Sequence, residues 1–234
     1  RWSDYDRLAQ GSLAGHLLEC GAQSTGGNFT DWEDVAEGYA DMGFPIAEVS
    51  ATGDFIMTKP QGTGGKVSRG TVAEQLVYEI GDPRAYQLPD VTCDFSDVTI
   101  TQIAPDRVQV SPAKGRAAPT HYKTCLTYMD GFRAGTYVTL YGENASAKAQ
   151  KLADAALTRA QKTLRLFNLG EYTEFSAEIL GVGSQMGEPR TSDEVVMKLA
   201  VKHPDMRAVG IFLKELAGIG LASPPGLSGF TGGG

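Results

Sequence analysis

Hydrophobic residues recur at helical spacing in two long stretches of the chain. Leu8, Leu13 and Leu17 mark one side of a helix that the pattern predicts over residues 4–20. Over residues 146–167, alanine, leucine and phenylalanine recur every three or four positions, which predicts a longer helix with one apolar side. Each helix is expected to bury its apolar side in a core.

Capping residues predict where several helices begin and end. Ser3 is the expected N-cap of the first helix, and Gly21 is expected to end it. Thr30 and Thr71 each stand three residues before a glutamate, which is the spacing of a capping box. They predict a short helix after Thr30 and a helix after Thr71 that ends near Ile80.

Alternating apolar and polar residues predict strands in the middle of the chain. The expected hairpins cover residues 48–59, 98–111 and 122–141. A further strand is predicted over residues 174–179, and two closing helices are predicted to begin at Ser192 and Pro204. Consecutive hairpins followed by helices indicate an α+β fold. We treat residues 1–234 as one core region, with a possible internal boundary near residues 142–145.

Charge and composition narrow the class of protein. The 234 residues include 21 Lys and Arg against 28 Asp and Glu, which gives a formal net charge of −7. This acidity argues against binding to nucleic acid or to an anionic membrane, and no apolar stretch is long enough to span a bilayer. The three cysteines form no CxxC pair. We therefore expect a soluble cytoplasmic protein without a disulfide framework.

The two ends of the sequence suggest a fragment. Position 1 is Arg1 rather than methionine, and residues 229–234 stop inside a glycine-rich loop. Chains rarely end on such a loop. We expect a longer protein, in which residues outside this sequence could complete a site.

Glycine-rich loops are the most distinctive feature, since glycine accounts for 29 of 234 residues. The triplet Thr-Gly-Gly occurs three times, starting at Thr25, Thr63 and Thr231. The second triplet lies in a loop that leads into a predicted helix and carries two cations. Backbone N–H groups, a helix N-terminus and these cations together predict an anion site. Its expected ligand-binding residues are Gly62, Thr63, Gly64, Gly65, Lys66 and Arg69.

The alternative for this loop is a tight strand-to-helix turn whose basic side chains are solvated. A phosphate-binding loop of the Walker type requires glycine at position 60 and Ser or Thr at position 67, where this chain has Pro60 and Val67. The first triplet loop carries no cation. Gly26, Gly27 and Asn28 are therefore expected to bind a carbonyl oxygen or a neutral polar group.

Three residues at the end of the first helix are candidates for catalysis. His16, Glu19 and Cys20 share one helix face and offer an acid/base pair with a possible nucleophile. A helix C-terminus disfavours a thiolate, so Cys20 would need help from a protonated His16. The alternative is a core or capping role for all three. Their spacing matches no strong zinc pattern, and no metal site is predicted.

Other polar residues have simpler interpretations. His121 and His203 are expected to be structural histidines. Asp90, Asp94 and Asp97 surround Cys93 in an acidic segment that either forms turns or collects a divalent cation. The residues alone indicate an α+β protein that binds an anion or an acyl group.

Several long motifs carry a family resemblance. They include LAGHLLECGAQ at residues 13–23 and TGGNFTDW at residues 25–32, with further matching stretches at residues 59–65, 70–83, 88–91 and 223–234. With these motifs the chain resembles the acyclic terpene utilisation (AtuA-type) family over nearly its whole length. The resemblance implies that family members are longer, with an N-terminal α/β region ahead of Arg1. It also implies a link to bacterial degradation of acyclic terpenes such as citronellol and geraniol, which proceeds through acyl-CoA thioesters, but it supplies no catalytic residues.

Two hypotheses follow. The first is a catabolic enzyme of the hydratase or lyase type that acts on a terpenoid or branched acyl-CoA or carboxylate. The glycine loop, Lys66 and Arg69 would hold the anion, and His16 or Glu19 would move a proton. No cofactor is required, and acyl-CoA is the expected substrate. The second is a non-catalytic accessory or assembly module, whose glycines, including Gly11 and Gly15, allow close packing. A homo-oligomer and contact with the missing N-terminal region are expected in either case.

Overall fold

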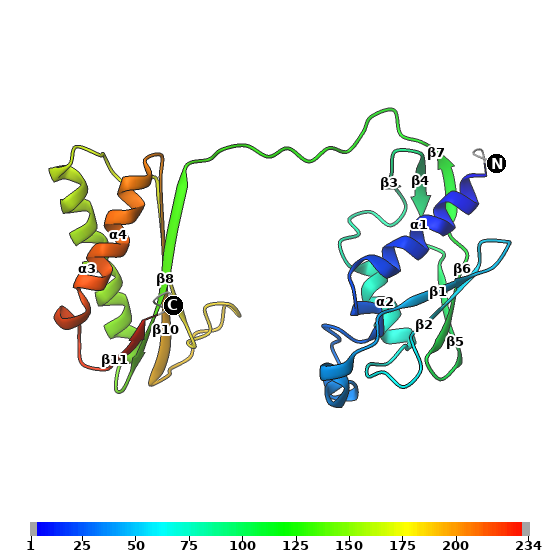
Figure 1. Ribbon diagram of the computed structural model, residues 1–234, viewed down its shortest axis with the longest axis horizontal. Helices are drawn as coiled ribbons and strands as arrows, with labels where there is room; N and C mark the ends of the chain where they lie inside the picture. Colours follow the sequence, from blue (N-terminus) through cyan, green and yellow to red (C-terminus); the bar gives the residue numbers. More distant parts are fainter. Residues whose placement is uncertain (1–3, 231–234) are drawn as a thin grey trace. The chain divides into compact units, whose positions relative to one another are not determined.

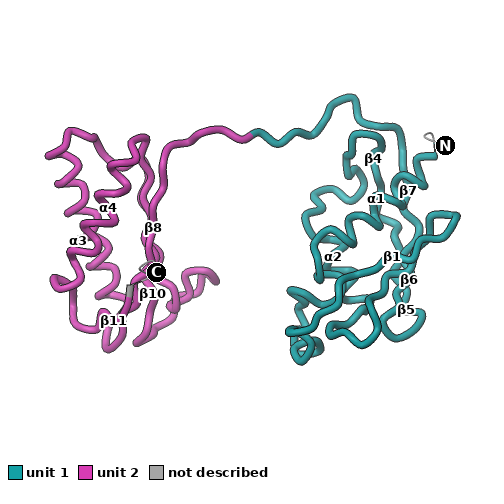
Figure 2. Tube along the Cα trace, in the orientation of Figure 1, with its two compact units in different colours: residues 1–126 teal, residues 127–234 magenta. Residues whose placement is uncertain are grey.

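The computed structural model describes residues 4–230 and divides the chain into two compact units, residues 1–126 and 127–234 (Figures 1 and 2). Each unit has its own cluster of buried hydrophobic side chains. Helices and antiparallel sheets occur in both, so the predicted α+β class is confirmed. Residues 142–145, where the sequence suggested a boundary, lie inside the second unit at the turn that leads into its first helix.

The first unit contains a four-stranded antiparallel sheet with the order β1-β2-β6-β5. Its strands are β1 (Ile46–Val49), β2 (Phe55–Thr58), β5 (Thr99–Ala104) and β6 (Arg107–Ser111). The predicted hairpins over 48–59 and 98–111 are confirmed as β1–β2 and β5–β6. Residues 105 and 106 form the β5–β6 turn, and Asp106 adopts a positive φ of 51° there.

A smaller sheet and two α-helices complete this unit. The sheet has the order β3-β4-β7, formed by β3 (Tyr86–Gln87), β4 (Val91–Asp94) and β7 (Lys114–Ala117). Helix α1 (Tyr5–Glu19) packs against β4 and β7, and α2 (Arg69–Val77) packs against α1. The buried core includes Leu13 and Leu17 of α1, as the hydrophobic pattern predicted.

The caps of these helices differ from the prediction in detail. Asp4 is the N-cap of α1 and accepts a hydrogen bond from the Arg7 N–H, whereas Ser3 lies outside the described residues. Gly21 follows the helix with a φ of 56°, as expected for its end. Helix α2 begins earlier than predicted, because Ser68 is its N-cap. Thr71 is the third helical residue (N3), and its side chain completes the capping box.

Short 3₁₀ helices occupy the loop between α1 and β1. They are η1 (Gln23–Thr25), η2 (Trp32–Asp34) and η3 (Ala36–Asp41). The helix predicted after Thr30 is therefore a single 3₁₀ turn. Its N-cap residue is Asp31, whose side chain makes no capping hydrogen bond, so the predicted capping box is wrong.

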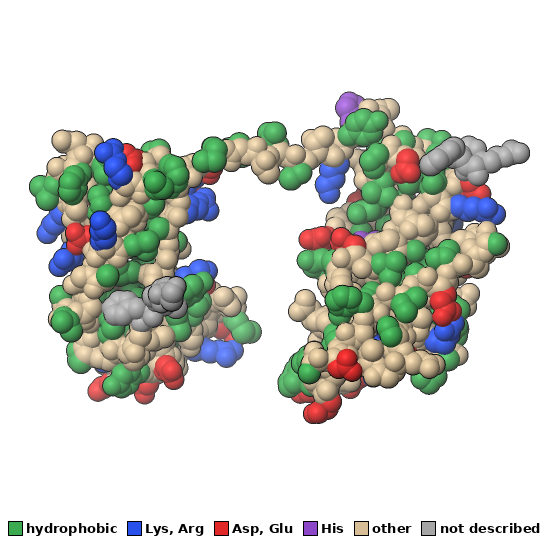
Figure 3. Space-filling view, in the orientation of Figure 1, with side chains coloured by type: hydrophobic (Ala, Val, Ile, Leu, Met, Phe, Trp, Pro, Cys, Tyr) green, Lys and Arg blue, Asp and Glu red, His purple; other side chains and the backbone are tan. Residues whose placement is uncertain are grey.

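Residues 118–131 form no helix or strand. Their hydrophobic side chains are exposed, including Tyr122 at 74% and Leu126 at 84% (Figure 3). The strand predicted over 122–128 is wrong. Its expected partner, residues 137–141, instead pairs on both sides with strands that come later in the chain.

The second unit is one antiparallel sheet with helices on one face (Figure 1). The strand order is β11-β8-β10-β9, formed by β8 (Phe132–Tyr141), β9 (Glu174–Leu180), β10 (Glu194–His203) and β11 (Leu227–Phe230). The strand predicted over 174–179 is confirmed as β9. The helix predicted from Ser192 is wrong, since β10 occupies that place. Val196 and Ala200 are apolar residues on the less buried face of β10. The alternation of apolar and polar residues that marks a strand is therefore hard to see in the sequence.

The helices of this unit are α3 (Ala145–Leu166), α4 (Met206–Gly218) and the short η4 (Gly220–Ala222). The predicted helices over 146–167 and after Pro204 are confirmed, with Asp205 as the N-cap of α4. Apolar residues of α3 and α4 meet Val195, Met197 and Leu199 of β10 in one core. No helix within residues 4–230 is both long enough and apolar enough to cross a membrane.

Candidate functional site

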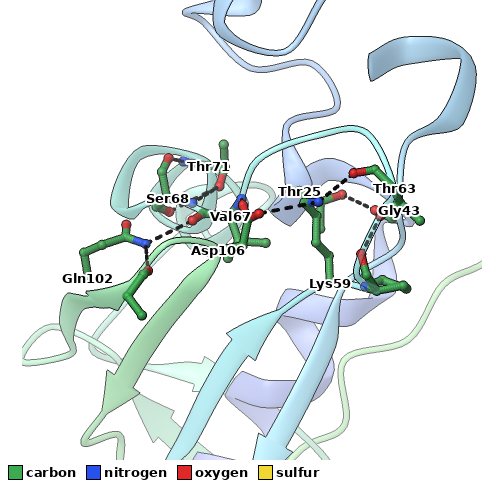
Figure 4. Close-up of polar contacts among 11 residues, drawn as sticks. Thr25, Gly43, Lys59, Thr63, Val67, Ser68, Thr71, Gln102 and Asp106 are labelled. Carbon is green, nitrogen blue, oxygen red and sulfur yellow. Dashed lines mark hydrogen bonds and ion pairs between the residues drawn. The ribbon is translucent and has the colours of Figure 1, made fainter. Parts of the chain in front are cut away.

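The first two Thr-Gly-Gly loops lie side by side in the first unit. The Lys66 N–H donates a hydrogen bond to the Thr25 carbonyl oxygen at 2.9 Å, and the Thr25 hydroxyl donates to the Gly43 carbonyl oxygen at 2.6 Å (Figure 4). Thr25 is fully buried. The structure therefore brings together two loops that the sequence predicted separately, whereas the third triplet lies outside the described residues.

Two glycines of the second loop are required for this close approach. A Cβ atom at Gly64 would lie less than 3.0 Å from the Gly38 backbone, closer than real Cβ contacts occur. Gly65 has a φ of +84°, and a Cβ there would lie 2.5 Å from the Thr25 carbonyl oxygen. Packing of backbone against backbone thus explains both glycines without any ligand.

The backbone N–H groups of this loop are mostly occupied. Five of them donate within the chain: Gly64 to the Asp41 carbonyl, Lys66 to the Thr25 carbonyl, Val67 to the Asp106 carboxylate, Ser68 to the Thr71 hydroxyl and Arg69 to the Gln102 side chain. Gln102 also donates to the Val67 carbonyl and so fastens the loop to the β5–β6 hairpin. An anion at this loop would therefore have to be held mainly by side chains.

The two cations of the loop have different surroundings. Lys66 forms an ion pair with Asp34 at 2.5 Å between Nζ and Oδ2, and both side chains are about half exposed. Within residues 4–230, Arg69 forms no side-chain ion pair. The Arg69 guanidinium is therefore better able than the Lys66 ammonium, which is already paired with Asp34, to form an ion pair with a ligand.

A buried lysine lies beside the same loop. The Lys59 ammonium donates to the Thr63 carbonyl oxygen at 2.7 Å and lies 3.5 Å from the Asp106 carboxylate (Figure 4). Only 6% of the Lys59 side chain is exposed. An ammonium group has three donors, and two have these partners. Lys59 therefore retains one donor for a ligand.

Lys59 and Asp106 line a polar pocket of about 430 Å³ at one end of the four-stranded sheet. The pocket lies where β2 ends and β6 begins, and Gly62 and Arg107 also line it. Arg107 and Glu48 form a bidentate ion pair across β2. Hydrogen bonding to Arg107 lowers the pKa of Glu48, so this carboxylate stays ionised and keeps its partner. The volume lies within the range of about 300–1,000 Å³ common for small-molecule sites.

The first loop uses its polar groups in its own turn. The Gly26 N–H donates to the Gln23 carbonyl and the Gly27 N–H to the Ala22 carbonyl. Asn28 adopts a positive φ of 55°. Among the described residues that line the polar pocket, none belongs to this loop.

His16 connects the two helices of the first unit. Its Nε2 lies 2.9 Å from the Gln75 carbonyl oxygen, while the Gln75 side-chain amide donates to the His16 carbonyl oxygen at 2.9 Å. Because Nε2 faces a carbonyl oxygen, it carries the proton. His16 is only 8% exposed. These contacts give His16 a role in holding α1 against α2.

Glu19 and Cys20 form a separate pair. The Cys20 thiol donates to the Glu19 carboxylate at 3.0 Å. This hydrogen bond is the largest cause that raises the pKa of Cys20, so the thiol form is favoured. Among the hydrogen bonds of the described residues, none joins His16 directly to Glu19 or Cys20, but both His16 and Cys20 contact Gln75, whose side chain lowers the pKa of Cys20.

Removing the Glu19 charge should make Cys20 more reactive. We expect Glu19→Gln to lower the pKa of Cys20, because the accepting carboxylate and its negative charge are lost. A lower pKa gives more thiolate, so alkylation of Cys20 by iodoacetamide at pH 8 should be faster than in the wild type. Peptide mass spectrometry measures that rate, with the exposed Cys125 as internal control. An unchanged rate at Cys20 would show that Glu19 does not govern the thiol.

The acidic segment around Cys93 consists of strand β4 and the turn that follows it at residues 96 and 97. Asp94 accepts hydrogen bonds from the Ser96 N–H and hydroxyl, which lower the pKa of Asp94. Asp97 pairs with Lys114 at 2.5 Å. Over residues 4–230, no three His, Cys, Asp or Glu residues are grouped so that they could hold a metal ion. The interpretation as a turn is confirmed for residues 96 and 97, whereas residues 91–94 are a strand.

The two remaining histidines differ from each other. His203 is buried, with Nε2 2.8 Å from the Leu169 carbonyl oxygen and Nδ1 accepting from the Asp205 N–H, so its predicted structural role is confirmed. His121 is exposed and lies in the segment without regular structure, where its Nδ1 contacts the Thr120 hydroxyl.

A comparison with protein-family models decides the family. The model of the acyclic terpene utilisation family protein AtuA matches residues 1–233. The chain belongs to the AtuA family. Searches of curated proteins and of solved structures each returned no match. Membership in the AtuA family links the chain to acyclic terpene utilisation and names no reaction.

Sequence reasoning missed three residues of the polar pocket and its surroundings in this AtuA-family chain, namely Lys59, Gln102 and Asp106. Lys59 follows β2, Asp106 occupies the β5–β6 turn, and Gln102 lies within β5 next to a register irregularity. One signal was present. An aspartate after proline in a two-residue hairpin turn takes a positive φ with little strain, and its short side chain remains close to the backbone.

Proposed function

We propose that this AtuA-family chain is a catabolic enzyme of acyclic terpene utilisation, which acts on a terpenoid or branched acyl-CoA or carboxylate by hydration or carbon–carbon cleavage. The observation that carries the proposal is the buried Lys59 ammonium, which lines a polar pocket and lies 3.5 Å from the Asp106 carboxylate. A buried cation next to a carboxylate in a pocket is a typical arrangement of catalytic groups.

The proposed chemistry uses the charge of Lys59. Addition of water to the β-carbon of an α,β-unsaturated thioester, or cleavage of the bond between the α- and β-carbons of a β-hydroxy thioester, places negative charge on the carbonyl oxygen. The fixed Lys59 ammonium would stabilise that charge. In this proposal the third Lys59 donor binds the carbonyl oxygen, and Asp106 accepts or returns the proton.

The glycine loop has a supporting role in the proposal. Lys66, Arg69 and the segment 62–65 contact the anionic end of the substrate, such as a phosphate of coenzyme A, chiefly through the two cationic side chains. The sequence led us to expect that Gly26, Gly27 and Asn28 polarise the carbonyl. In this proposal Lys59 polarises it instead, because the Gly26 and Gly27 N–H groups donate within their own loop. The proposal places proton transfer at Asp106 rather than at His16, which is held by Gln75.

A second candidate function is a non-catalytic accessory or assembly module of the same pathway. One observation favours it: backbone packing alone explains Gly64 and Gly65. We propose a cytoplasmic homo-oligomer in either case, completed by the N-terminal region that the family resemblance implies.

Lys59→Met tests the leading proposal. We expect it to weaken binding of citronellyl-CoA and citronellate by about 1–3 kcal/mol, the scale of hydrogen bonds to charged groups. Isothermal titration calorimetry on the full chain measures the affinity. Lys151→Met, an exposed lysine of α3, is the matched control and should bind like the wild type. Circular dichroism checks that both variants are folded.

Two further variants separate the roles. Asp106→Asn keeps an oxygen that can accept from the Val67 N–H and removes the charge, so binding should persist while hydration of geranyl-CoA, an α,β-unsaturated thioester, is lost. Lys66→Ala should weaken binding of the CoA ester more than that of the free acid. If the folded wild type binds neither compound and forms a stable oligomer, the accessory function is favoured instead.

A further inference from the structure

A second pocket, of about 420 Å³, lies in the second unit between the end of α3 and α4. The exposed atoms of its lining are mostly apolar, and its hydrophobic residues are Phe167, Leu169 and Ile211. Phe167 is 65% exposed, which is unusual for a phenylalanine without a partner. Hydrophobic side chains lie among Lys and Arg side chains over this part of the surface (Figure 3). The lining therefore suits an apolar chain.

Gly210 lines this pocket and borders free space. It lies in the interior of α4, where glycine is the least favourable residue after proline. A Cβ atom at Gly210 would meet no heavy atom of the chain within 4 Å, and Gly210 lines the pocket. The space beside α4 is therefore free at this position, and a longer side chain at residue 210 would enter the pocket.

The charges at the pocket do not cancel. Glu215 accepts from Arg159 at 3.0 Å and from the Thr163 hydroxyl at 2.8 Å, and Arg207 is paired with Asp205. Lys214, the remaining charged residue of the lining, forms no ion pair within residues 4–230. The pocket thus combines an apolar lining with one uncompensated ammonium.

We infer that this pocket binds an amphiphilic monocarboxylate, whose aliphatic chain lies against Phe167, Leu169 and Ile211 and whose carboxylate contacts Lys214. The hydrophobic lining accounts for the chain and the uncompensated ammonium for the acid group. The site lies in a different unit from Lys59 and does not depend on the proposed function.

Binding of three C10 probes to the full chain tests which head group the pocket prefers. Decanoate, decanol and decyltrimethylammonium share the chain length and differ in charge. We expect decanoate to bind most tightly and the cation least, as measured by titration calorimetry below the micelle concentration. Lys214→Gln should weaken decanoate about fivefold and leave decanol unchanged. Equal affinity for decanoate and decanol would overturn the contact with Lys214, and no binding of decanoate would overturn the site.

Variants at Gly210 test the place of binding. Gly210→Leu should fill the space beside α4 and weaken both decanoate and decanol at least about tenfold, because the chain loses its apolar contacts. Gly210→Ala is the matched control and should keep most of the affinity. Wild-type affinity in a folded Gly210→Leu variant would overturn the assignment of the pocket. If Gly210→Leu does not fold, Lys214→Glu decides: decanoate affinity must fall below that of Lys214→Gln, and otherwise the inference is wrong.

Discussion

Gly64→Ala is expected to lower the free energy of unfolding by about 3 kcal/mol, the upper range for overpacking a closely packed site. The added methyl group would lie against the backbone of Gly38, which cannot turn aside as a side chain could. The Gly64 N–H also donates to the Asp41 carbonyl at 2.7 Å, and its carbonyl accepts from Gly43 at 3.1 Å. Moving Gly64 to relieve the clash would lengthen both hydrogen bonds.

Denaturant unfolding measures this effect, and two other glycines serve as controls. Gly81 has open space around its Cβ position and an ordinary φ, so Gly81→Ala should change stability by less than about 0.5 kcal/mol. Gly62 also has space but a φ of +75°. Gly62→Ala should therefore cost about 1 kcal/mol through backbone strain alone. A Gly64→Ala variant as stable as Gly81→Ala would contradict the close packing of the two loops.

Phe212→Ala should destabilise the second unit by about 3–5 kcal/mol, since the ring is fully buried and its removal leaves a cavity. Phe212 lies on α4 in the core shared with α3 and the sheet. Its ring also makes an edge contact with Tyr172, with centroids 6.0 Å apart. Such a contact adds to the cost of losing the ring.

Hydrogen exchange of the backbone amides of β8 and β10 measures this loss within the unit itself. Leu213 is the matched control, because it follows Phe212 on the same helix but is 42% exposed. Leu213→Ala should cost less than about 1 kcal/mol. Equal loss of protection in the two variants would show that burial of Phe212 does not stabilise this core.

Local patterns predicted the four α-helices and two short hairpins, but they also placed a helix where β10 lies and failed where pairing is distant. Helix α3 shows one apolar stripe over its whole length, and the β1–β2 and β5–β6 hairpins each enclose a short turn. Strand β8 pairs with β10 and β11, which follow more than 50 residues later. Nothing in residues 122–141 specifies those partners, so the nearest alternating stretch was chosen wrongly.

The candidate site was predicted only in part, because some of its contacts join residues that are distant in the sequence. The glycine triplets and the chain direction into α2 are visible in the sequence, and the structure brings the loops of Thr25 and Thr63 together. The sequence does not show that Asp106, about 40 residues later, occupies the Val67 N–H. That single contact removes a donor from the expected anion site and holds the carboxylate near Lys59.

The contacts of Gly38, Gly64 and Gly65 also restrict how the loops can change during evolution. Each of these residues opposes backbone atoms, which are present whatever the neighbouring side chains are. A second substitution therefore cannot compensate for a methyl group at any of them. Gly11 and Gly15 meet no atom within 4 Å at their Cβ positions and remain open to replacement. Related chains that keep these loops should vary at Gly11 and Gly15 long before they lose glycine at positions 38, 64 and 65.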